Sequence, residues 1–513
     1  LSDIILGGFG NDLINAGQGD NNIVIGDHGR LRSAEDMESE QLATPLDGHP
    51  ITLGRIETIS PAIGGGSDII TTGLGRDIIL GGLGDDSIFA YGSITQTDGT
   101  VIVDANAAGQ DTSNIVIGDH GFIDYVSEDS DAADIDRIWS TQEENFLLGG
   151  SDLIYTGEQN DIIIAGSRGD EIYAGNGINL VLGDSGRLTA AIVDEAGDWA
   201  AHDFTLGLVQ TTGREDDGGE LIVTGNDNDV VIGGIGDDVI FTDDGNDVVL
   251  GGHGLIGYAD TTIDGILVFE DPDAIDDVSI IDEIRTDYVP GDDEITGGRG
   301  NDILLGGGGR DEITGNEGND LIFGDHGLLI GNIDPNSGFD LPLSELVPAY
   351  QVVSISTEEL VDGHSFAIYD GDLLGDDDYI EGNSGADIII GGQGADTILG
   401  GSQDDDIVGG HAITGFGING GLILVGGVVL STDARSYDSD DLLNAVSNGH
   451  DGGDYIDAGS ENDFVAGDNA RFERRPDSIS ERMRVLKETT IYGELISGPN
   501  GETNDGHALV TLD

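Results

Sequence analysis

Aspartate recurs at the sixth position of a nine-residue unit, G-G-x-G-x-D-x-U-x, in which U is an aliphatic residue. The unit is clearest in residues 297–327, where three copies run head to tail and close on a GDHG turn. Glycine at positions 1, 2 and 4 adopts backbone angles closed to other residues and exposes carbonyl oxygens. Calcium takes about six to eight oxygen ligands in flexible geometry, which stacked carbonyls and carboxylates can supply. The pattern therefore predicts calcium binding.

Seven clusters of this unit are separated by acidic interruptions. The nonapeptide resembles the repeat of the RTX, or hemolysin-type, family of secreted bacterial proteins. The resemblance covers the clusters and implies an all-β fold, a parallel β-roll or β-helix solenoid. Because the chain begins inside a repeat, we expect a piece of a giant secreted or cell-surface repeat protein. RTX proteins are typically exported by type I secretion, which implies an extracellular location. The clusters span residues 1–29, 64–121, 149–186, 218–254, 291–327, 375–412 and 452–470.

In the RTX roll two nonapeptides make one coil, so turns stacked on one edge should lie 18 residues apart. Asp302 and Asp320 keep this spacing, while the pairs Glu220/Asp238 and Asp161/Asn179 keep it with altered ligands and should be weaker. A single such aspartate could equally be an Asx-turn residue, but a whole set in one register favours roughly ten to twenty calcium ions. The candidate ligands are Asp12, Asp68, Asp77, Asp86, Asp152, Asp161, Asp170, Asp229, Asp238, Asp247, Asp293, Asp302, Asp311, Asp320, Asp378, Asp387, Asp396, Asp405, Asp454 and Asp463.

The interruptions are expected to form β-hairpin lobes that leave the solenoid and return. One of them, Ala412–Thr432, carries no charge and is long enough to span a bilayer. Its six glycines favour two apolar strands instead, so we expect no membrane insertion. The lobes span residues 30–63, 122–148, 187–217, 255–290, 328–374, 413–451 and a locally basic 471–513, and a further insertion spans 93–112.

Position 8 of the unit is almost always aliphatic and should point inward, which leaves positions 7 and 9 on the outside. The second and fourth strands of most clusters are apolar throughout, such as III at 162–164 and ILL at 303–305. The first and third strands are more mixed, such as EIT at 312–314. An apolar outer face should be covered. We expect either the interruptions or a second chain to cover it, so self-association or contact with neighbouring repeats is a predicted partnership.

The charge and the cysteine content of the chain limit the kinds of binding partner that it can have. With 18 Lys and Arg against 101 Asp and Glu, the net charge is −83. Such a chain repels itself and also repels nucleic acid and anionic membranes, so neither is an expected partner. There is no cysteine, which excludes disulfides and thiolate zinc sites.

No catalytic motif accompanies the repeats. Histidine recurs in the closing turns, as in His28, His120 and His253, but is replaced by Ser185 and Asn469, which indicates a turn residue. We expect no enzyme, but a calcium-binding structural module of an adhesin stalk, extracellular filament or surface layer. Two alternatives stay open. One is the accessory region of a secreted protease, lipase or polysaccharide-modifying enzyme; the other is a glycan- or surface-binding module using Trp139 and Trp199.

Overall fold

The computed structural model forms two compact units, Leu1–Asp243 and Asp244–Asp513. The boundary falls inside the fourth repeat cluster, and corresponding sheets of the two units carry the same letter below. The structure describes residues 2–17, 21–37, 49, 51–59, 65–97, 100–104, 112–127, 132–140, 149–190, 202, 204, 206–212, 218–258, 262–263, 266–267, 278–283, 291–325, 327–331, 352–356, 359–361, 365–367, 376–392, 394–410, 412–415, 422–425, 428–431, 453–460, 463–467, 470–473 and 508–511.

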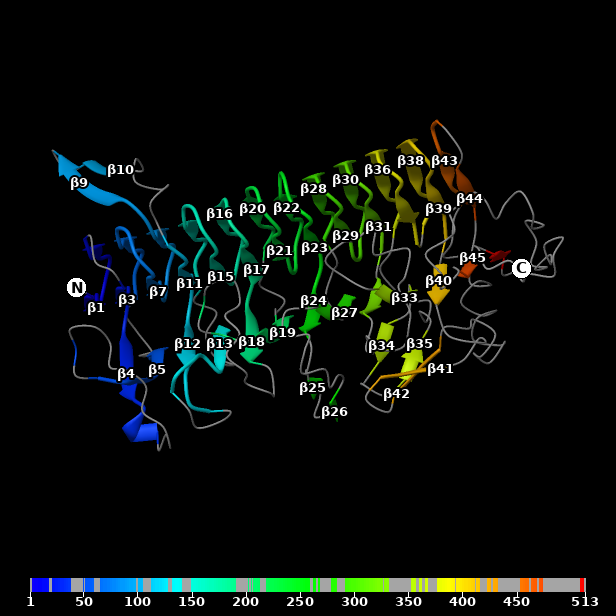
Figure 1. The fold of residues 1–513 in the computed structure, drawn as a ribbon. Coiled ribbons are helices and arrows are strands. Elements are labelled where there is room, and N and C mark those ends of the chain that lie inside the picture. The colour runs from blue at the N-terminus through cyan, green and yellow to red at the C-terminus, as the bar shows by residue number, and fades with distance from the viewer. Residues whose placement is uncertain are drawn as a thin grey trace. The chain divides into compact units, whose positions relative to one another are not determined.

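In the first unit, successive nonapeptides alternate between two parallel sheets (Figure 1). Each nonapeptide is a glycine-rich turn followed by a short strand, so two nonapeptides complete one coil. Sheet A contains, in spatial order, β1 (Ile4–Leu6), β3 (Ile23–Ile25), β7 (Ile78–Leu80), β11 (Ile115–Ile117), β15 (Ile162–Gly166), β17 (Leu180–Asp184) and β21 (Val230–Ile232). Sheet B contains β2 (Leu13–Asn15), β6 (Ile69–Thr71), β8 (Ser87–Phe89), β14 (Leu153–Tyr155), β16 (Glu171–Gly175), β20 (Leu221–Thr224) and β22 (Val239–Phe241).

The second unit repeats this alternation. Its sheet A contains β23 (Val248–Leu250), β29 (Ile303–Leu305), β31 (Leu321–Phe323), β37 (Ile388–Ile390), β39 (Asp406–Val408) and β44 (Phe464–Ala466). Its sheet B contains β28 (Glu294–Arg299), β30 (Glu312–Glu317), β36 (Tyr379–Ser384), β38 (Thr397–Ser402) and β43 (Tyr455–Asp457). The predicted all-β roll is therefore confirmed.

The interruptions build a third sheet. In the first unit, sheet C is antiparallel and contains β4 (Gly29–Ser33), β5 (Leu53–Thr58), β12 (Gly121–Asp124), β13 (Arg137–Ser140), β18 (Gly186–Ala190) and β19 (Leu206–Thr211). In the second unit it contains β24 (Gly254–Tyr258), β27 (Val278–Glu283), β32 (Leu328–Gly331), β33 (Val352–Ser356), β40 (Ala412–Gly415), β45 (Ala470–Glu473) and β46 (Ala508–Thr511). Successive interruptions pair with one another, as β5 does with β12 and β13 with β18.

A few short elements lie outside the three sheets. The 3-10 turn η1 (Glu35–Met37) follows β4. The insertion at 93–112 contains the antiparallel hairpin β9 (Ser93–Thr97) and β10 (Thr100–Asp104). Three further hairpins are β25 (Thr262–Ile263) with β26 (Ile266–Leu267), β34 (Glu359–Val361) with β35 (Ser365–Ala367), and β41 (Leu422–Val425) with β42 (Val428–Ser431). The last pair places strands in the charge-free stretch. No helix in the described part of the chain is long and apolar enough to cross a membrane.

The core of the roll is a single layer of position-8 side chains. Ile79, Ile163 and Ile172 are fully buried in the first unit, as are Leu304 and Ile398 in the second. Because each strand is only a few residues long, one inward side chain per strand fills the space between sheets A and B. The predicted inward direction of position 8 is confirmed.

The outer faces of the two parallel sheets differ as predicted. Positions 7 and 9 of sheet A are mostly buried, including Ile162, Ile164, Ile303 and Leu305, whereas those of sheet B, apart from the buried Thr71, are partly or fully exposed. In the first unit, the glycine that begins a sheet C strand directly after a sheet A strand packs against sheet A: a Cβ on Gly121 would lie 2.8 Å from Ile117 Cδ1, and Gly29 and Gly186 face Ile25 and Leu182 in the same way. Glycine therefore fits these three crossings from sheet A to sheet C, whereas alanine begins β40 and β45 in the second unit.

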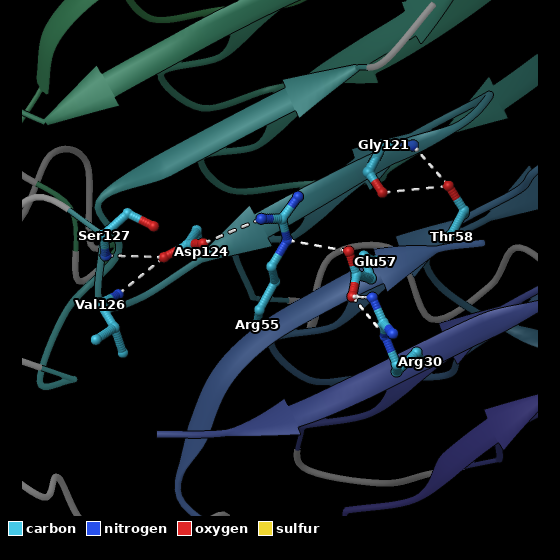
Figure 2. A network of polar contacts seen from close by, with 8 residues as sticks. All are labelled: Arg30, Arg55, Glu57, Thr58, Gly121, Asp124, Val126 and Ser127. Atoms are coloured by element: carbon cyan, nitrogen blue, oxygen red, sulfur yellow. Dashed lines mark hydrogen bonds and ion pairs between the residues drawn. The ribbon is translucent and has the colours of Figure 1, made fainter. Parts of the chain in front are cut away.

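Sheet C of the first unit holds its own strands together with polar contacts. Figure 2 shows Arg55 between Glu57 (Nε to Oε2, 3.2 Å) and Asp124 (Nη1 to Oδ2, 3.6 Å). The Arg55 guanidinium also lies 3.7 Å from the centre of the Phe122 ring. Arg30 donates to Glu57 at 2.7 Å. These contacts join β4, β5 and β12, which belong to two different interruptions.

Candidate metal centre

The residue at position 6 stands directly before each strand, and those that precede sheet B form one column, the B-edge ladder. The backbone amide of most members donates to a side-chain oxygen one coil on, as from Asp12 to Asp68 Oδ1 and from Asp68 to Asp86 Oδ1, both at 2.7 Å. In the first unit the members are Asp12, Asp68, Asp86, Asp152, Asp170, Glu220 and Asp238, and in the second Asp293, Asp311, Asp378, Asp396 and Asp454.

The residues that precede sheet A form a second column, the A-edge ladder, with the same bonding. In the first unit aspartate and asparagine alternate along it; in the second unit every member is aspartate. The members are Asp3, Asn22, Asp77, Asn114, Asp161, Asn179 and Asp229 in the first unit, and Asp247, Asp302, Asp320, Asp387, Asp405 and Asp463 in the second.

The asparagines use their amide groups on turn carbonyls. Asn22 Nδ2 donates to the Thr72 carbonyl at 3.0 Å, and Asn179 Nδ2 donates to the carbonyls of Gly175 at 3.1 Å and Gly177 at 2.9 Å. A carboxylate cannot donate these bonds. At an asparagine position, turn carbonyl oxygens are thus satisfied by the protein itself.

At the aspartate positions the second carboxylate oxygen points into the turns. Oδ2 of several ladder residues is buried and accepts no hydrogen bond, including Asp12, Asp68, Asp86, Asp152, Asp170, Asp302, Asp320 and Asp378. It converges with backbone carbonyls: a Cβ on Gly26 would lie 2.5 Å from both Asp68 Oδ2 and the Gly81 carbonyl oxygen. Buried anionic oxygens beside carbonyl oxygens match the ligand preference of calcium, so these residues fit a hard cation.

The electrostatics of the ladders point the same way. Burial raises the pKa of Asp302 to about 7. Burial also raises the pKa of Asp320 to about 9, and the negative charges of Asp387 and Asp302 add to this second shift. Burial likewise raises the pKa of Asp152 and Asp170 well above the usual range, and acidic neighbours add to it. Without a cation these carboxyl groups would have to bind protons to stay buried.

The acidic side chains follow one another one per coil. Accordingly, no group of three or more His, Asp and Glu side chains meets around one point within the described residues. A cation here would take one or two carboxylates and draw its remaining ligands from backbone carbonyls, as the glycine-rich turns provide.

All of the aspartates predicted as ligands lie in one of the two ladders. Eleven precede sheet B and nine precede sheet A, so the structure separates them into two columns on opposite edges of the roll. The terminal members are the least buried, since Asp12, Asp454 and Asp463 are only half-buried. The predicted weaker pairs, Glu220/Asp238 and Asp161/Asn179, occupy regular ladder positions.

Sequence reasoning missed two groups of residues. Asp3, Asn22 and Asn114 are ladder members that stand before strands but lack a complete nonapeptide. The apolar strand that follows each of them was the sequence feature that could have identified it. The aspartates of the closing turns, Asp27, Asp119, Asp184 and Asp325, are buried beside the B-edge ladder, and the repetition of GDHG was their signal.

The closing-turn histidines do not gather into a site in the described structure. His120 and His253 are buried, and burial lowers the pKa of each to about 4. His326 and His411 lie outside the described residues. Trp139 is half-buried, with its ring 5.7 Å from that of Phe122, and Trp199 also lies outside the described residues.

Two columns of aspartates on a nonapeptide roll define a calcium-binding β-roll as the class of protein. The family model for the RTX calcium-binding nonapeptide repeat, in four copies, matches residues 2–27, 63–92, 146–167, 216–254, 289–327 and 374–410. The chain therefore carries RTX calcium-binding repeats. The last cluster, 452–470, lies outside these matches, yet its strands β43 and β44 continue sheets B and A of the second unit. No curated protein matches the chain.

Proposed function

We propose that this chain is a structural repeat module of a secreted or cell-surface protein, held folded by many calcium ions along its two ladders. The observation that carries the proposal is the row of buried Oδ2 atoms that accept no hydrogen bond and lie beside backbone carbonyls. The proposed ligands are the position-6 aspartates. When bound, calcium supplies positive charge that offsets these carboxylates in the folded state only.

The chain's own residues prepare the sites. Ladder hydrogen bonds from backbone amides to Oδ1 fix each carboxylate so that Oδ2 faces the turn. Position-8 side chains align the coils by filling the core. Because the unfolded chain does not hold these oxygens together, calcium binds the folded state and stabilises it by mass action. In low calcium the net charge of −83 opposes compaction, whereas extracellular calcium would favour it.

A structural role is supported by where the recognisable polar groups lie. Within the described structure, the ladder acids face turns, and His120 and His253 are buried as turn residues. Sheet C covers one outer face of the roll, so apolar residues of sheet A are not left for substrate. We propose an adhesin stalk, filament or surface-layer component rather than an enzyme.

Circular dichroism and sedimentation velocity during a calcium titration test this proposal. Starting from chelator and rising to millimolar calcium, β signal and sedimentation coefficient should rise together and cooperatively. A magnesium titration is the control, because Mg²⁺ prefers octahedral geometry and keeps its waters, and should produce a much smaller change. A chain already folded in chelator, and unchanged by calcium, would falsify the proposal.

A further inference from the structure

Six closing turns of the roll share one contact. The first glycine of each of these six turns faces the first B-edge acid of the following cluster. A Cβ on Gly118 would collide with Asp152 Oδ2, and one on Gly324 would collide with Asp378 Oδ2. The same relation pairs Gly26 with Asp68, Gly183 with Glu220, Gly251 with Asp293 and Gly409 with Asp454.

The next residue of the turn divides these positions into two kinds. At four of them it is aspartate, Asp27, Asp119, Asp184 or Asp325, and at two it is glycine, Gly252 or Gly410. The four aspartates are at most 5% exposed. The chain therefore contains its own comparison between turns with and without a second carboxylate.

Backbone amides hold this second carboxylate in place. Asp119 accepts from Ser167 at 2.7 Å through Oδ2 and from Gly150 at 3.0 Å through Oδ1. Asp27 and Asp184 accept through Oδ2 from Leu83 and Ile235, each at 2.6 Å. Because each carboxylate oxygen has two lone pairs, these bonds leave acceptor capacity on the group.

The second carboxylate and the B-edge acid lie against the same glycine-rich turns. A Cβ on Gly149 would collide with Asp119 Oδ2, as one on Gly118 would with Asp152 Oδ2. In the same way, a Cβ on Gly392 would collide with Asp325 Oδ2, and one on Gly324 with Asp378 Oδ2. Oδ2 of Asp152 and of Asp378 is buried and accepts no hydrogen bond. Two buried carboxylates side by side are strongly unfavourable unless a cation lies with them.

We propose that Asp27, Asp119, Asp184 and Asp325 are additional calcium ligands, each forming a two-carboxylate site with the first B-edge acid of the next cluster. The partners are Asp68, Asp152, Glu220 and Asp378. The inference rests on the proposed function, since it adds ligands to the calcium ladder. These four sites carry more negative charge than the turns at Gly252 and Gly410, so they bind calcium more tightly. They also lie where sheet C leaves the roll, so these ions fix the position of that sheet.

The test is calcium binding to the full chain, measured by competition with a chromophoric chelator, for wild type and Asp119→Asn. Asparagine keeps the size and an acceptor oxygen but removes the charge. The number of tightly bound ions should fall by one, with that ion bound on the order of tenfold more weakly. Glu35→Gln is the matched control, because it removes one charge from an exposed acid of η1 and should leave binding unchanged.

Gly252→Asp is the converse variant, because it adds a carboxylate to a turn that lacks one. It keeps the inference testable even if Asp119→Asn fails to fold. It should add one tightly bound ion, and circular dichroism at saturating calcium should match wild type for every variant. An unchanged number of tight ions in Asp119→Asn, with lower stability in chelator, overturns the inference, because Asp119 would then act only as an acceptor for backbone amides. Failure of the proposed function is distinguishable, because wild type itself would then bind no calcium.

Discussion

The A-edge ladder is built differently in the two units. In the first unit Asn22, Asn114 and Asn179 alternate with aspartates, and their amide groups bond turn carbonyls. In the second unit an unbroken run of aspartates occupies the same positions. An asparagine supplies a hydrogen bond where, under the proposed function, an aspartate would bind a cation. The comparison teaches that hydrogen bonds of the protein can take the place of the proposed ions, coil by coil.

The outer face of sheet B follows the same division. In the first unit Phe89, Tyr155 and Tyr173 stack in register, with ring centres 5.4 and 4.5 Å apart. In the second unit the same position 9 holds Thr296 and Thr314, which have no rings, and position 7 presents Glu294 and Glu312, both exposed. Packed rings stabilise without metal, whereas neighbouring glutamates repel. We therefore expect the first unit to depend less on calcium than the second.

The largest expected effect is in hydrogen exchange. As calcium is withdrawn from the full chain, amides of β37 and β39 should lose protection first, while those of β15 and β17 should stay protected to a calcium concentration at least about threefold lower. Exchange followed by mass spectrometry at stepped free calcium would measure both. Simultaneous loss in the two units, or earlier loss in the first, would contradict the comparison.

Exchanging asparagine and aspartate in the A-edge ladder should exchange the calcium dependence of stability between the two positions. In chelator, Asn179→Asp should lose about 1–2 kcal/mol of unfolding free energy, because the bonds to Gly175 and Gly177 disappear. Asp320→Asn in the second unit should become more stable in chelator and bind one ion fewer. Urea unfolding with and without calcium measures both, and Glu312→Gln, at an exposed position, is the control. Asp320→Asn losing stability equally in both conditions would count against a ligand role.

The dependence on pH follows from the buried carboxyl groups. Burial raises the folded pKa of Asp229 to about 8 and of Asp320 to about 9, well above the unfolded value of 3.8. A raised pKa means that the folded state retains its proton, so this stability is fully present below about pH 4 and is lost as the pH rises through the folded pKa. In chelator, melting temperature should therefore be higher at pH 5 than at pH 9. With calcium present the trend should reverse, because protons compete with the metal.

The smallest effect concerns the aromatic column. Tyr155→Leu keeps an apolar side chain but removes both ring contacts, and should lower stability by about 1 kcal/mol whether or not calcium is present. Thr314→Val, at the same repeat position in the second unit, is a comparison variant without a ring stack and should change little. A calcium-dependent loss in Tyr155→Leu would show that the column and the ladders are not independent.

Much of this architecture was legible in the sequence because it is local. Position 6 and position 8 keep one residue type through many copies, so the ladder residues and the inward layer, such as Ile163 and Ile398, followed directly. The buried face of sheet A followed from the apolar runs at 162–164 and 303–305. What could not be predicted was non-local. The pairing of β5 with β12 joins residues more than sixty positions apart, and no periodicity in the interruptions marks it. The burial of Asp27 near Asp68 could not be predicted either, because the two residues belong to different clusters.

The ladder hydrogen bonds have similar lengths whether few or many residues separate their partners in the sequence. Asp302 bonds Asp320 at 3.0 Å across 18 residues, and Asp320 bonds Asp387 at 2.9 Å across 67. Adjacent coils therefore stack in the same way whatever the length of the chain segment between them. For the gene, this means that duplicating or deleting a stretch encoding 18 residues adds or removes a whole coil with its own ligands. The same geometry lets interruptions of different length stand between coils that keep one register.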